Sequence, residues 1–488
     1  MTSSLEVLLA DAGLRLTAGD PALSPPITGV TADSRDVRPG YLFVAVPGLT
    51  VDGHDYVDAA VAAGATAVLA KAGHATPRPG VAWVECDDPA AAAGPLAASF
   101  YEHPSQQLEL VGVTGTNGKT TVATLCCDLF TALGYRCGLI GTVEVRIAGR
   151  SLAATHTTPD AVGLQRLLHR MAEAGCGYVF MEVSSHALHQ HRTAGCTFAG
   201  GVFTNVSHDH LDYHGDMKAY IAAKKLLFDG LPRAAFALVN ADDKRGAVML
   251  QNTAARPRTF ALRRLADYKA RVLDDDLRGL HLDLDGRDVH TRLAGAFNAY
   301  NLLAAYGVAR ELGQDADEVL AALSALPGAA GRLEVVRAPG ASVLGIVDYA
   351  HTPDALRNVL ETLQPARRRG RRVITVFGCG GDRDAAKRPR MGAIAAELSD
   401  QVVITDDNPR TEQPAAIREE IEAGLSAEQR ARALEIGDRR QAIRAAVRLA
   451  RPDDVVLVAG KGHETYQEVA GERRDFDDRA VLREYLAA

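Results

Sequence analysis

Short apolar segments alternate with helical stretches along most of the chain, and this alternation restricts its fold more than any other feature. The apolar segments of residues 107–330 include LELVGVTG, YVFMEVSS, GGVFTNV and AAFALVN, and those of residues 331–488 include SVLGIVDYAH, RVITVFGCGG, QVVITDDN and VVLVAGKGH. Strands that alternate with helices in this way pair in parallel, in α/β sheets. The functional loops of such sheets follow the carboxyl ends of the strands. The sequence therefore predicts an α/β protein whose site lies at those strand ends.

Two breaks in the pattern divide the chain into three predicted domains, 1–106, 107–330 and 331–488. The polar segment EHPSQQLE (102–109) contains a proline and is typical of a linker. A second break is predicted at ALPGAAGR (325–332), where proline and glycine interrupt a helical stretch. We expect a small N-terminal domain, a central domain with a parallel sheet, and a C-terminal Rossmann-like domain.

Composition and charge exclude several classes of protein. The chain holds 54 Lys and Arg against 61 Asp and Glu, a formal net charge of −7, which disfavours nucleic-acid binding. The basic run RRRGRR (367–372) is therefore interpreted as a solvated helix end. No apolar run is long enough to cross a membrane, and the N-terminus lacks the features of a signal peptide. Seven scattered cysteines without a CxxC pair indicate reduced thiols, so we expect a cytoplasmic protein.

A phosphate-binding loop is predicted at VGVTGTNGKTT (111–121), between an apolar strand and a helix. Backbone N–H groups in such a turn and at the helix N-terminus can surround a phosphate. Lys119 would neutralise the terminal phosphates of a nucleotide, and the Thr120 hydroxyl would reach Mg²⁺. The loop is a variant of the G-x-x-x-x-G-K-[ST] pattern, because Val113 stands where that pattern has its first glycine.

A polar cluster follows the next two strands of the central domain. Six of the fifteen histidines lie in residues 186–214, but they are mixed with acidic and amide residues, which favours Mg²⁺ over zinc. Glu182 ends the strand FMEVSS, and His210 follows the next strand, so both can approach a bound phosphate. Lys224 lies beside Lys225 in a helix, and such a pair is ordinarily part of a solvated face.

Taken together, the motifs resemble those of the ATP-dependent Mur ligases of peptidoglycan synthesis. The motifs that carry the resemblance are GTNGKTT (115–121), TTPD (157–160), EVSSHAL (182–188), NVSHDHLDYHGD (205–216), GAFNAYN (295–301), GRLE (331–334), DYAHTPD (348–354) and DNPR (407–410). They extend over nearly the whole chain, and they are most similar to the branch of the family that adds meso-diaminopimelate.

The resemblance implies roles for residues in all three domains. ATP would contact Gly115, Thr116, Asn117, Gly118, Lys119, Thr120, Thr121, Asn298, Asn301, Arg332 and Asp348. Mg²⁺ would be held by Thr120, Glu182 and His210, and Lys224 would be carbamylated by CO₂ to become an acidic group. Lys119, Glu182, His210 and Lys224 would then be the catalytic residues. The UDP-muramoyl-dipeptide would contact Ser34, Leu49, Thr50, Val51, Thr157, Thr158, Ser184, Gln190 and Arg192.

The amino-acid selector is expected in the C-terminal domain. Meso-diaminopimelate carries a distal carboxylate and ammonium that L-lysine does not offer together. A guanidinium forms two parallel hydrogen bonds with a carboxylate, and the lysine-adding relatives lack the arginine of DNPR. The resemblance therefore implies that Arg410 and Arg388 bind the carboxylate and that Gly460 and Glu464 receive the ammonium. The rest of the DNPR segment, Asp407, Asn408 and Pro409, would line the same site.

The activity implied by the resemblance is an amide ligation driven by ATP. The D-glutamyl γ-carboxylate would be phosphorylated, and the amine of diaminopimelate would then displace phosphate; His351 is a candidate base for that amine. ATP and Mg²⁺ would be the cofactors, and the enzyme would act as a monomer on small molecules, without nucleic acid or membrane. Addition of L-lysine, or of glutamate to a folate, is an alternative on the same fold. A P-loop ATPase switch that forms no amide, and an inactive nucleotide-binding scaffold, are alternatives of other classes.

Overall fold

The structure is a computed structural model that describes residues 1–14, 24–48, 51–74, 77–153, 156–207, 209–276 and 279–488. The chain forms two compact units. The first unit comprises Met1–Phe260 and Gly307–Asp315, and the second comprises Ala261–Tyr306 and Ala316–Ala488. None of the helices formed by the described residues is both long and apolar enough to cross a bilayer.

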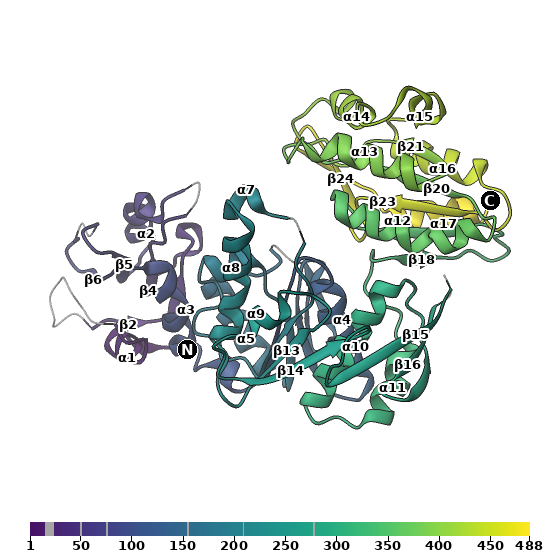
Figure 1. Cartoon of the computed structure of the whole chain (residues 1–488). Coiled ribbons are helices and arrows are strands. Elements are labelled where there is room, and N and C mark those ends of the chain that lie inside the picture. The colour runs from purple at the N-terminus through teal and green to yellow at the C-terminus, as the bar shows by residue number, and fades with distance from the viewer. Residues whose placement is uncertain (15–23, 49–50, 75–76, 154–155, 208, 277–278) are drawn as a thin grey trace. The chain divides into compact units, whose positions relative to one another are not determined.

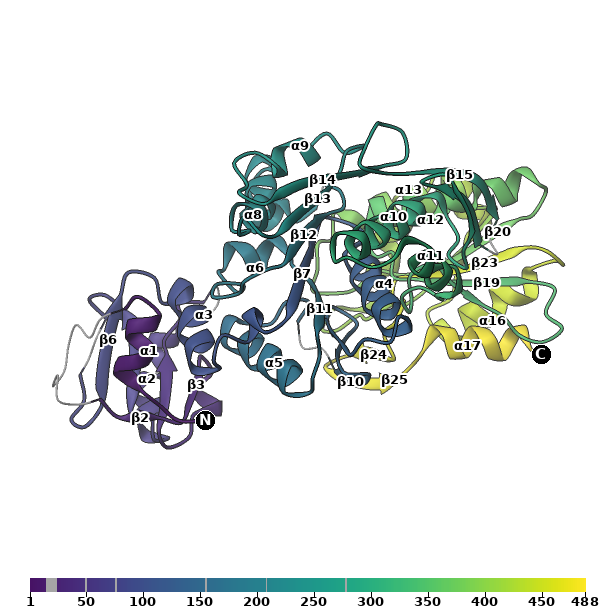
Figure 2. The ribbon, with the colours of Figure 1, turned by 90° about the horizontal axis from the view of Figure 1, so that it is seen from below.

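The N-terminal part of the first unit is a parallel sheet with the strand order β3-β4-β5-β6. Its strands are β3 (Gly29–Thr31), β4 (Tyr41–Val44), β5 (Ala67–Lys71) and β6 (Ala82–Cys86), preceded by the short pair β1 (Ser3–Ser4) and β2 (Pro26–Ile27). Its helices are α1 (Leu5–Asp11), α2 (Val57–Ala62) and α3 (Pro89–Phe100). Helix α3 lies beside α5 (Ala161–Glu173) in both views of Figures 1 and 2, and Ala161 and Val162 of α5 join the N-terminal core.

The central part of the first unit is a sheet with the order β10-β9-β8-β11-β7-β12-β13-β14. Its strands are β7 (Glu109–Thr114), β8 (Cys137–Ile140), β9 (Glu144–Ile147), β10 (Arg150–Ala153), β11 (Tyr178–Glu182), β12 (Gly200–Phe203), β13 (Phe236–Asn240) and β14 (Arg256–Ala261). Its further helices are α4 (Lys119–Ala132), α6 (Ser185–His189), α7 (Leu211–His214), α8 (Met217–Asp229) and α9 (Gly246–Met249). Strand β7 pairs in parallel with β11 on one side and β12 on the other, so the loops after these three strands share one edge.

The second unit begins with an antiparallel ribbon of β15 (Tyr268–Asp276), β16 (Gly279–Leu284) and β17 (Arg287–His290). Two helices follow, α10 (Ala296–Glu311), whose last residues belong to the first unit, and α11 (Ala316–Ala325). A mostly parallel sheet then has the order β18-β19-β23-β20-β21-β22. Its strands are β18 (Glu334–Val336), β19 (Leu344–Asp348), β20 (Val373–Phe377), β21 (Gln401–Ile404), β22 (Leu434–Glu435) and β23 (Val455–Ala459), and β24 (Tyr466–Val469) and β25 (Glu472–Asp475) form a separate hairpin.

Helices cover both faces of this second sheet (Figure 1). Alternate strand residues point to opposite faces. Residues such as Phe377 and Leu457 therefore pack against α12 (Pro353–Arg368), α13 (Lys387–Leu398) and α14 (Pro414–Glu422). Val376 and Val458 pack on the other face against α16 (Arg439–Leu449) and α17 (Asp478–Leu486), and α15 (Ala427–Arg432) is a short surface helix. The continuous apolar segments for which the sequence predicted parallel strands thus form one mostly parallel sheet between two layers of helices.

A buried ion pair joins the two helices on the second face. The Arg439 guanidinium donates two hydrogen bonds to the Asp478 carboxylate, at 2.7 Å and 2.8 Å, and both side chains are fully buried. Arg439 also donates to the Ala459 carbonyl at the end of β23, at 3.0 Å. Removing one member of a buried pair leaves an uncompensated charge, which is far more costly than the loss of an exposed pair.

We predict that Asp478→Asn lowers the free energy of unfolding by about 3–5 kcal/mol, because Arg439 is then left without its buried counter-ion. The matched control is Glu484→Gln, which removes the exposed partner of Arg440 between the same two helices and should change that free energy by less than about 1 kcal/mol. Urea unfolding followed by circular dichroism measures both. Equal effects of the two substitutions would contradict the assignment of the Arg439–Asp478 pair as a stabilising contact.

Candidate active site

The predicted phosphate loop connects the end of β7 to the start of α4. Gly115 has φ +151°, and a Cβ at this position would lie 1.9 Å from the Thr204 hydroxyl, so only glycine fits there. Asn205 fixes the loop from β12: its carbonyl accepts from the Thr116 N–H at 2.8 Å, and its side-chain oxygen accepts from the Asn117 N–H at 3.0 Å. Helix α4 starts at Lys119, so the N–H groups of its first turn lack helical partners and can bind an anion.

Two lysines converge on the carbonyl of Gly115. Lys119 Nζ donates to this oxygen at 2.9 Å and to the Thr116 carbonyl at 2.9 Å, and Lys224 Nζ donates to the Gly115 oxygen at 2.8 Å. Lys224 is only 1% exposed, and its Nζ lies 4.3 Å from the centre of the Tyr220 ring. Burial, together with the charge of Lys119, holds the pKa of Lys224 well below its usual value.

The environment of Lys224 decides between two interpretations of the Lys224–Lys225 pair. The ordinary interpretation, a solvated charged face, is wrong for Lys224, which points inward from α8; Lys225 lies at the surface and pairs with Asp229. A lowered pKa raises the neutral fraction of an amine at a given pH, and the neutral amine is the form that reacts with CO₂. The predicted carbamylation therefore has a physical basis at Lys224 and none at Lys225.

Glu182 provides a carboxylate at the edge of the sheet next to the loop. It is 1% exposed and ends β11, where its Oε2 accepts from the Thr120 hydroxyl at 2.8 Å and its Oε1 accepts from the Thr142 N–H at 2.6 Å. Carboxylate and hydroxyl oxygens are the donors that Mg²⁺ prefers beside a nucleotide. Glu182 and Thr120 thus fit the predicted Mg²⁺ site.

The predicted third metal ligand, His210, lies at a more open position. Its side chain is 46% exposed, its Nε2 is 3.5 Å from the Asp209 carboxylate, and its ring is 4.8 Å from that of His186. Its backbone has φ +54° at the start of α7. These contacts do not test its metal role, which stays a prediction.

The residues predicted to bind the dipeptide form one hydrogen-bonded network after β11. Thr158 Oγ1 donates to the Glu182 carbonyl at 2.8 Å and accepts from the Ser184 N–H at 3.2 Å. Arg192 donates to the Thr158 carbonyl at 3.0 Å and to the side-chain oxygen of Gln190 at 2.7 Å and 3.0 Å. The Thr157 hydroxyl accepts from that of Thr142 at 3.0 Å. The structure thus brings these five predicted residues together beside Glu182.

The other four residues predicted to contact the UDP-muramoyl-dipeptide are Ser34, Leu49, Thr50 and Val51. Ser34 begins a short 3₁₀ turn whose N-terminus is capped by the Asp33 carboxylate. Val51 is exposed, and Leu49 and Thr50 lie outside the described residues. The role of these four residues stays a prediction.

The second unit holds the remaining residues predicted to contact ATP. Asn298 and Asn301 are buried on α10, where Asn301 donates to the Asn298 side-chain oxygen at 2.8 Å. The Arg332 guanidinium lies 4.7 Å from the centre of the Tyr349 ring. Burial raises the pKa of Asp348 to about 6, although Arg332 acts in the opposite direction, and its Oδ2 accepts from the Leu333 N–H at 2.6 Å.

His351, the candidate base, follows β19 by three residues. It is exposed, and its Nδ1 is 2.9 Å from the Tyr349 carbonyl. A second histidine, His463, packs against the Tyr349 ring at 5.0 Å, and burial lowers its pKa to about 4. Neither contact identifies the base, and the role of His351 stays a prediction.

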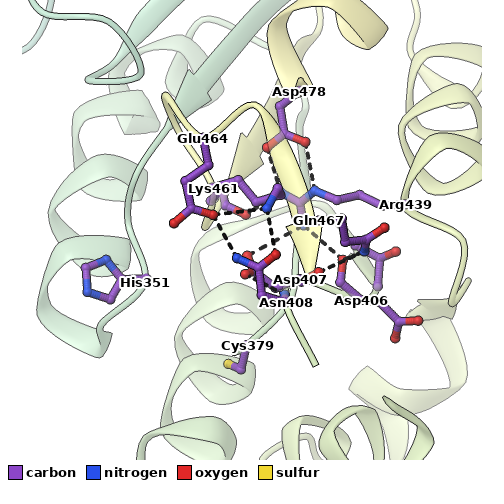
Figure 3. Close-up of polar contacts among 12 residues, drawn as sticks. His351, Cys379, Asp406, Asp407, Asn408, Arg439, Lys461, Glu464, Gln467 and Asp478 are labelled. Atoms are coloured by element: carbon purple, nitrogen blue, oxygen red, sulfur yellow. Dashed lines mark hydrogen bonds and ion pairs between the residues drawn. The ribbon is translucent and has the colours of Figure 1, made fainter. Parts of the chain in front are cut away.

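Of the predicted selector residues, Asp407, Asn408 and Glu464 lie beyond the ends of β21 and β23, the strands on either side of β20 in the second sheet (Figure 3). Arg388 lies in α13. Asn408, 2% exposed, donates from Nδ2 to Glu464 Oε2 at 2.8 Å. Its Oδ1 accepts from Lys461 Nζ at 3.0 Å and from the Glu468 N–H at 2.9 Å. Lys461 is fully buried and also donates to Glu464 Oε2 at 3.0 Å. These contacts fix which end of the Asn408 amide faces Glu464.

Backbone conformation positions the rest of the selector segment. Arg410 has φ +52°, and its Nη1 donates to the Gly381 carbonyl at 2.7 Å. Gly460 has φ +117°, and a Cβ there would lie 2.5 Å from Asp407 Oδ2. The Pro409 carbonyl passes so close to Gly381 that a Cβ on Gly381 would lie 1.9 Å away. The loops after the three strands therefore hold one another in place.

The two arginines of GGDRDAAKR have different environments. Arg388 is 1% exposed, and its guanidinium is occupied by Glu412, at 2.8 Å and 2.9 Å, and by Glu420, at 2.9 Å. Arg383 is exposed, and both it and Arg410 border Gly380: a Cβ there would lie 3.0 Å from Arg410 Nη1 and 4.0 Å from Arg383 Cγ. This geometry favours a supporting role for Arg388 and makes Arg383 the second guanidinium that a ligand can reach.

Sequence reasoning gave no site role to Asn205, Lys461 or Arg383. Asn205 and Lys461 lie in the segments NVSHDHLDYHGD and VVLVAGKGH, and Arg383 closely follows the segment RVITVFGCGG. A lysine inside an otherwise apolar strand end is a usable signal, because an unpaired lysine is rarely buried. The pairing of Arg388 with Glu412 and Glu420 had no such signal, since these carboxylates are 24 and 32 residues away.

Comparison with known proteins places the whole chain in one group. Residues 26–101 match the model "Mur ligase family, catalytic domain", residues 113–309 match "Mur ligase middle domain", and residues 331–462 match "Mur ligase, glutamate ligase domain". A Cytophaga hutchinsonii protein named UDP-N-acetylmuramoyl-L-alanyl-D-glutamate–2,6-diaminopimelate ligase is 50% identical over 461 residues, 94% of each chain. A Thermosynechococcus vestitus protein of the same name is 44% identical over 490 residues, 99% of this chain and 98% of its own.

Solved structures give the same grouping. One of a ligase with that name is 35% identical, with a TM-score of 0.71, and the match covers 100% of this chain and 99% of the other. A Mycobacterium tuberculosis folylpolyglutamate synthase complexed with ADP and AMPPCP is 20% identical, with a TM-score of 0.60, and covers 75% of this chain and 91% of its own. At that identity the likeness shows a shared fold.

We predict that ¹³C-labelled bicarbonate gives a carbamate signal in the ¹³C NMR spectrum of the protein, and that Lys224→Ala removes it. The lowered pKa of Lys224 raises the neutral, reactive fraction of its amine, and the carbamate is lost as the pH falls and the amine is protonated. Lys225→Ala is the matched control on the same helix. A signal that survives Lys224→Ala but not Lys225→Ala would contradict the assignment.

Proposed function

The chain belongs to the Mur ligase family, and from that premise we propose that it joins meso-2,6-diaminopimelate to UDP-N-acetylmuramoyl-L-alanyl-D-glutamate at the expense of ATP. The observation that carries the proposal is the 50% identity to ligases of that name over 94% of the chain. The selector segment supports it, because Arg410 and Arg383 border one glycine and can together bind a distal carboxylate.

The first step activates the carboxylate of D-glutamate. A carboxylate oxygen attacks the γ-phosphorus of ATP, the bond from that phosphorus to the bridging oxygen breaks, and ADP leaves. Lys119 and the N-terminus of α4 bind the phosphates and stabilise the charge that develops on the phosphoryl oxygens. Thr120 and Glu182 would hold Mg²⁺, which when bound neutralises phosphate charge.

The second step forms the amide. The amine of diaminopimelate attacks the acyl carbon, the carbon–oxygen bond to phosphate breaks, inorganic phosphate leaves and the amine loses a proton. The network of Thr158, Ser184 and Arg192 positions the dipeptide beside Glu182. The Asn408–Lys461–Glu464 network orients the amino acid, with Glu464 facing its ammonium.

The remaining assignments follow the resemblance. We assign residues 1–106 to UDP-substrate binding, 107–330 to ATP binding and 331–488 to amino-acid binding; the spans of the three family matches support this division. Carbamylated Lys224 completes the cation site, and Asn298, Asn301, Arg332 and Asp348 contact ATP. The enzyme works as a cytoplasmic monomer on small-molecule substrates.

Release of ADP with the UDP-muramoyl-dipeptide and each candidate amino acid tests the function. We predict turnover with meso-diaminopimelate and little with L-lysine or L-glutamate. Arg410→Lys should raise the KM for diaminopimelate at least about tenfold, because an ammonium cannot form the two parallel bonds, and leave the KM for ATP unchanged. Arg474→Lys, at an exposed position of β25, is the control. Preference for L-lysine, or equal loss of both KM values, would contradict the proposal.

We predict that Lys461→Met raises the KM for diaminopimelate with a smaller effect on kcat, because Glu464 and the Asn408 amide lose the donor that orients them. The Asn408 side-chain oxygen then keeps the hydrogen bond from the Glu468 N–H but loses the one from Lys461, so the orientation of the amide is less restrained. Lys461→Arg should restore part of the affinity by donating to the same oxygens. A fall in kcat with an unchanged KM for diaminopimelate would contradict the role of Lys461 in orienting the residues that bind the amino acid.

A further inference from the structure

Two histidines and an aspartate, side chains of the types that bind metals, lie on the outer face of the β16–β17 hairpin. Leu280, Leu282 and Leu284 of β16 are buried, so His281 points to the opposite face. The strand register places His290 directly opposite His281, and Asp288 lies two residues before His290, on the same face. The alternation of the two strands therefore presents two imidazoles and a carboxylate to solvent at one place.

The ligand atoms of these side chains already lie close to the spacing that a metal requires. His281 Nε2 is 2.8 Å from Asp288 Oδ1, and His290 Nε2 is 3.5 Å from the same oxygen. All three ligand atoms lie within 4.8 Å of one another. In a tetrahedral site with metal–ligand distances of about 2.0–2.1 Å, neighbouring ligand atoms are about 3.3 Å apart. The two separations from Asp288 lie on either side of that value and the third is within 4.8 Å, so side-chain rotations would bring the three atoms to the spacing of a metal site.

The chemistry of the donors selects a class of cation. Imidazole suits Zn²⁺, Cu²⁺ and Ni²⁺, whereas Mg²⁺ prefers oxygen ligands. The two rings are stacked, with their centres 4.0 Å apart and planes at 15°, and both present Nε2 to the same carboxylate oxygen. The side chains of Asp288 and His290 are 66% and 75% exposed, which leaves room for water at a fourth position. The site therefore suits a borderline divalent cation such as Zn²⁺.

Local charge also favours a cation here. Asp283 and Asp288 are directly opposite each other in the register, and like charges at such positions destabilise a strand pair. Arg271 compensates Asp283 at 3.2 Å. A divalent cation bound to Asp288 would remove the remaining repulsion and link β16 to β17.

We propose that His281, Asp288 and His290 form a binding site for a Zn²⁺-class cation. It is the one place in the described ranges where three His, Cys, Asp or Glu side chains bring their ligand atoms within 4.8 Å. The histidine-rich segment after β11, which first suggested a metal, does not meet this condition among its described residues. The site is independent of the ligase reaction and stabilises the hairpin.

The test uses the full-length protein, freed of metal by a chelator and kept in excess Mg²⁺. Zn²⁺ is titrated in competition with a chromophoric chelator, and Co²⁺ is titrated with detection of its visible absorption. We expect His281→Ala and His290→Ala each to weaken Zn²⁺ binding at this site at least about tenfold, since loss of even an outer-shell partner costs 10–100-fold. Asp283→Asn, on the same face of the hairpin, is the matched control and should keep the site.

Two results would overturn the proposal: a wild type that binds no Zn²⁺, or a His281→Ala/His290→Ala double variant that binds Zn²⁺ with the stoichiometry and affinity of the wild type. A melting experiment excludes misfolding as the cause of lost binding. Because His290 is exposed and His281 is partly exposed, we expect the metal-free double variant to have the same melting temperature as the metal-free wild type. Zn²⁺ should raise the melting temperature of the wild type and of Asp283→Asn, but not that of the double variant.

Discussion

The convergence of Lys119 and Lys224 on the Gly115 carbonyl is the constraint on which the nucleotide site depends. Both amines lie within 2.9 Å of this oxygen, and the burial of Lys224, together with the charge of Lys119, lowers the pKa of Lys224. Asn205 and Thr204 hold the loop from β12, and Glu182 approaches from β11, so three adjacent parallel strands shape one site. An exposed Lys224 would stay charged and unreactive toward CO₂.

The second unit uses buried charge in a different way. Lys461, Arg388 and Arg439 are all nearly inaccessible, and each is paired with a carboxylate. The pairs of Lys461 and Arg388 involve the loops after parallel strands, and the pair of Arg439 joins α16 to α17. Buried ionic groups of this kind add little stability over an apolar core, but removing one partner is costly. The pairs thus keep the loops of DNPR and GKGHE in one arrangement, which a site that distinguishes a zwitterionic side chain from a simple amine requires.

The sequence predicted the α/β fold and its parallel sheets, because buried parallel strands are continuous apolar runs that can be recognised locally. It also placed the predicted phosphate loop, Glu182 and the DNPR segment at or after strand ends, where the structure has them, and their roles stay predictions. It could not determine which long side chains are paired: Arg388 meets carboxylates 24 and 32 residues away, and Lys224 turns inward where Lys225 turns outward. Such choices depend on tertiary contacts, and neighbouring residues of the same type give no local signal to separate them.

The central claim is that ATP converts an inert carboxylate into an acyl phosphate, and isotope transfer tests it most directly. The γ-carboxylate of the dipeptide substrate is labelled with ¹⁸O, and the phosphate released with meso-diaminopimelate is analysed by mass spectrometry. Attack of the carboxylate on the γ-phosphorus predicts that one ¹⁸O atom appears in each phosphate. Turnover that releases unlabelled phosphate would contradict the account, because the substrate oxygen would then never have been bonded to phosphorus.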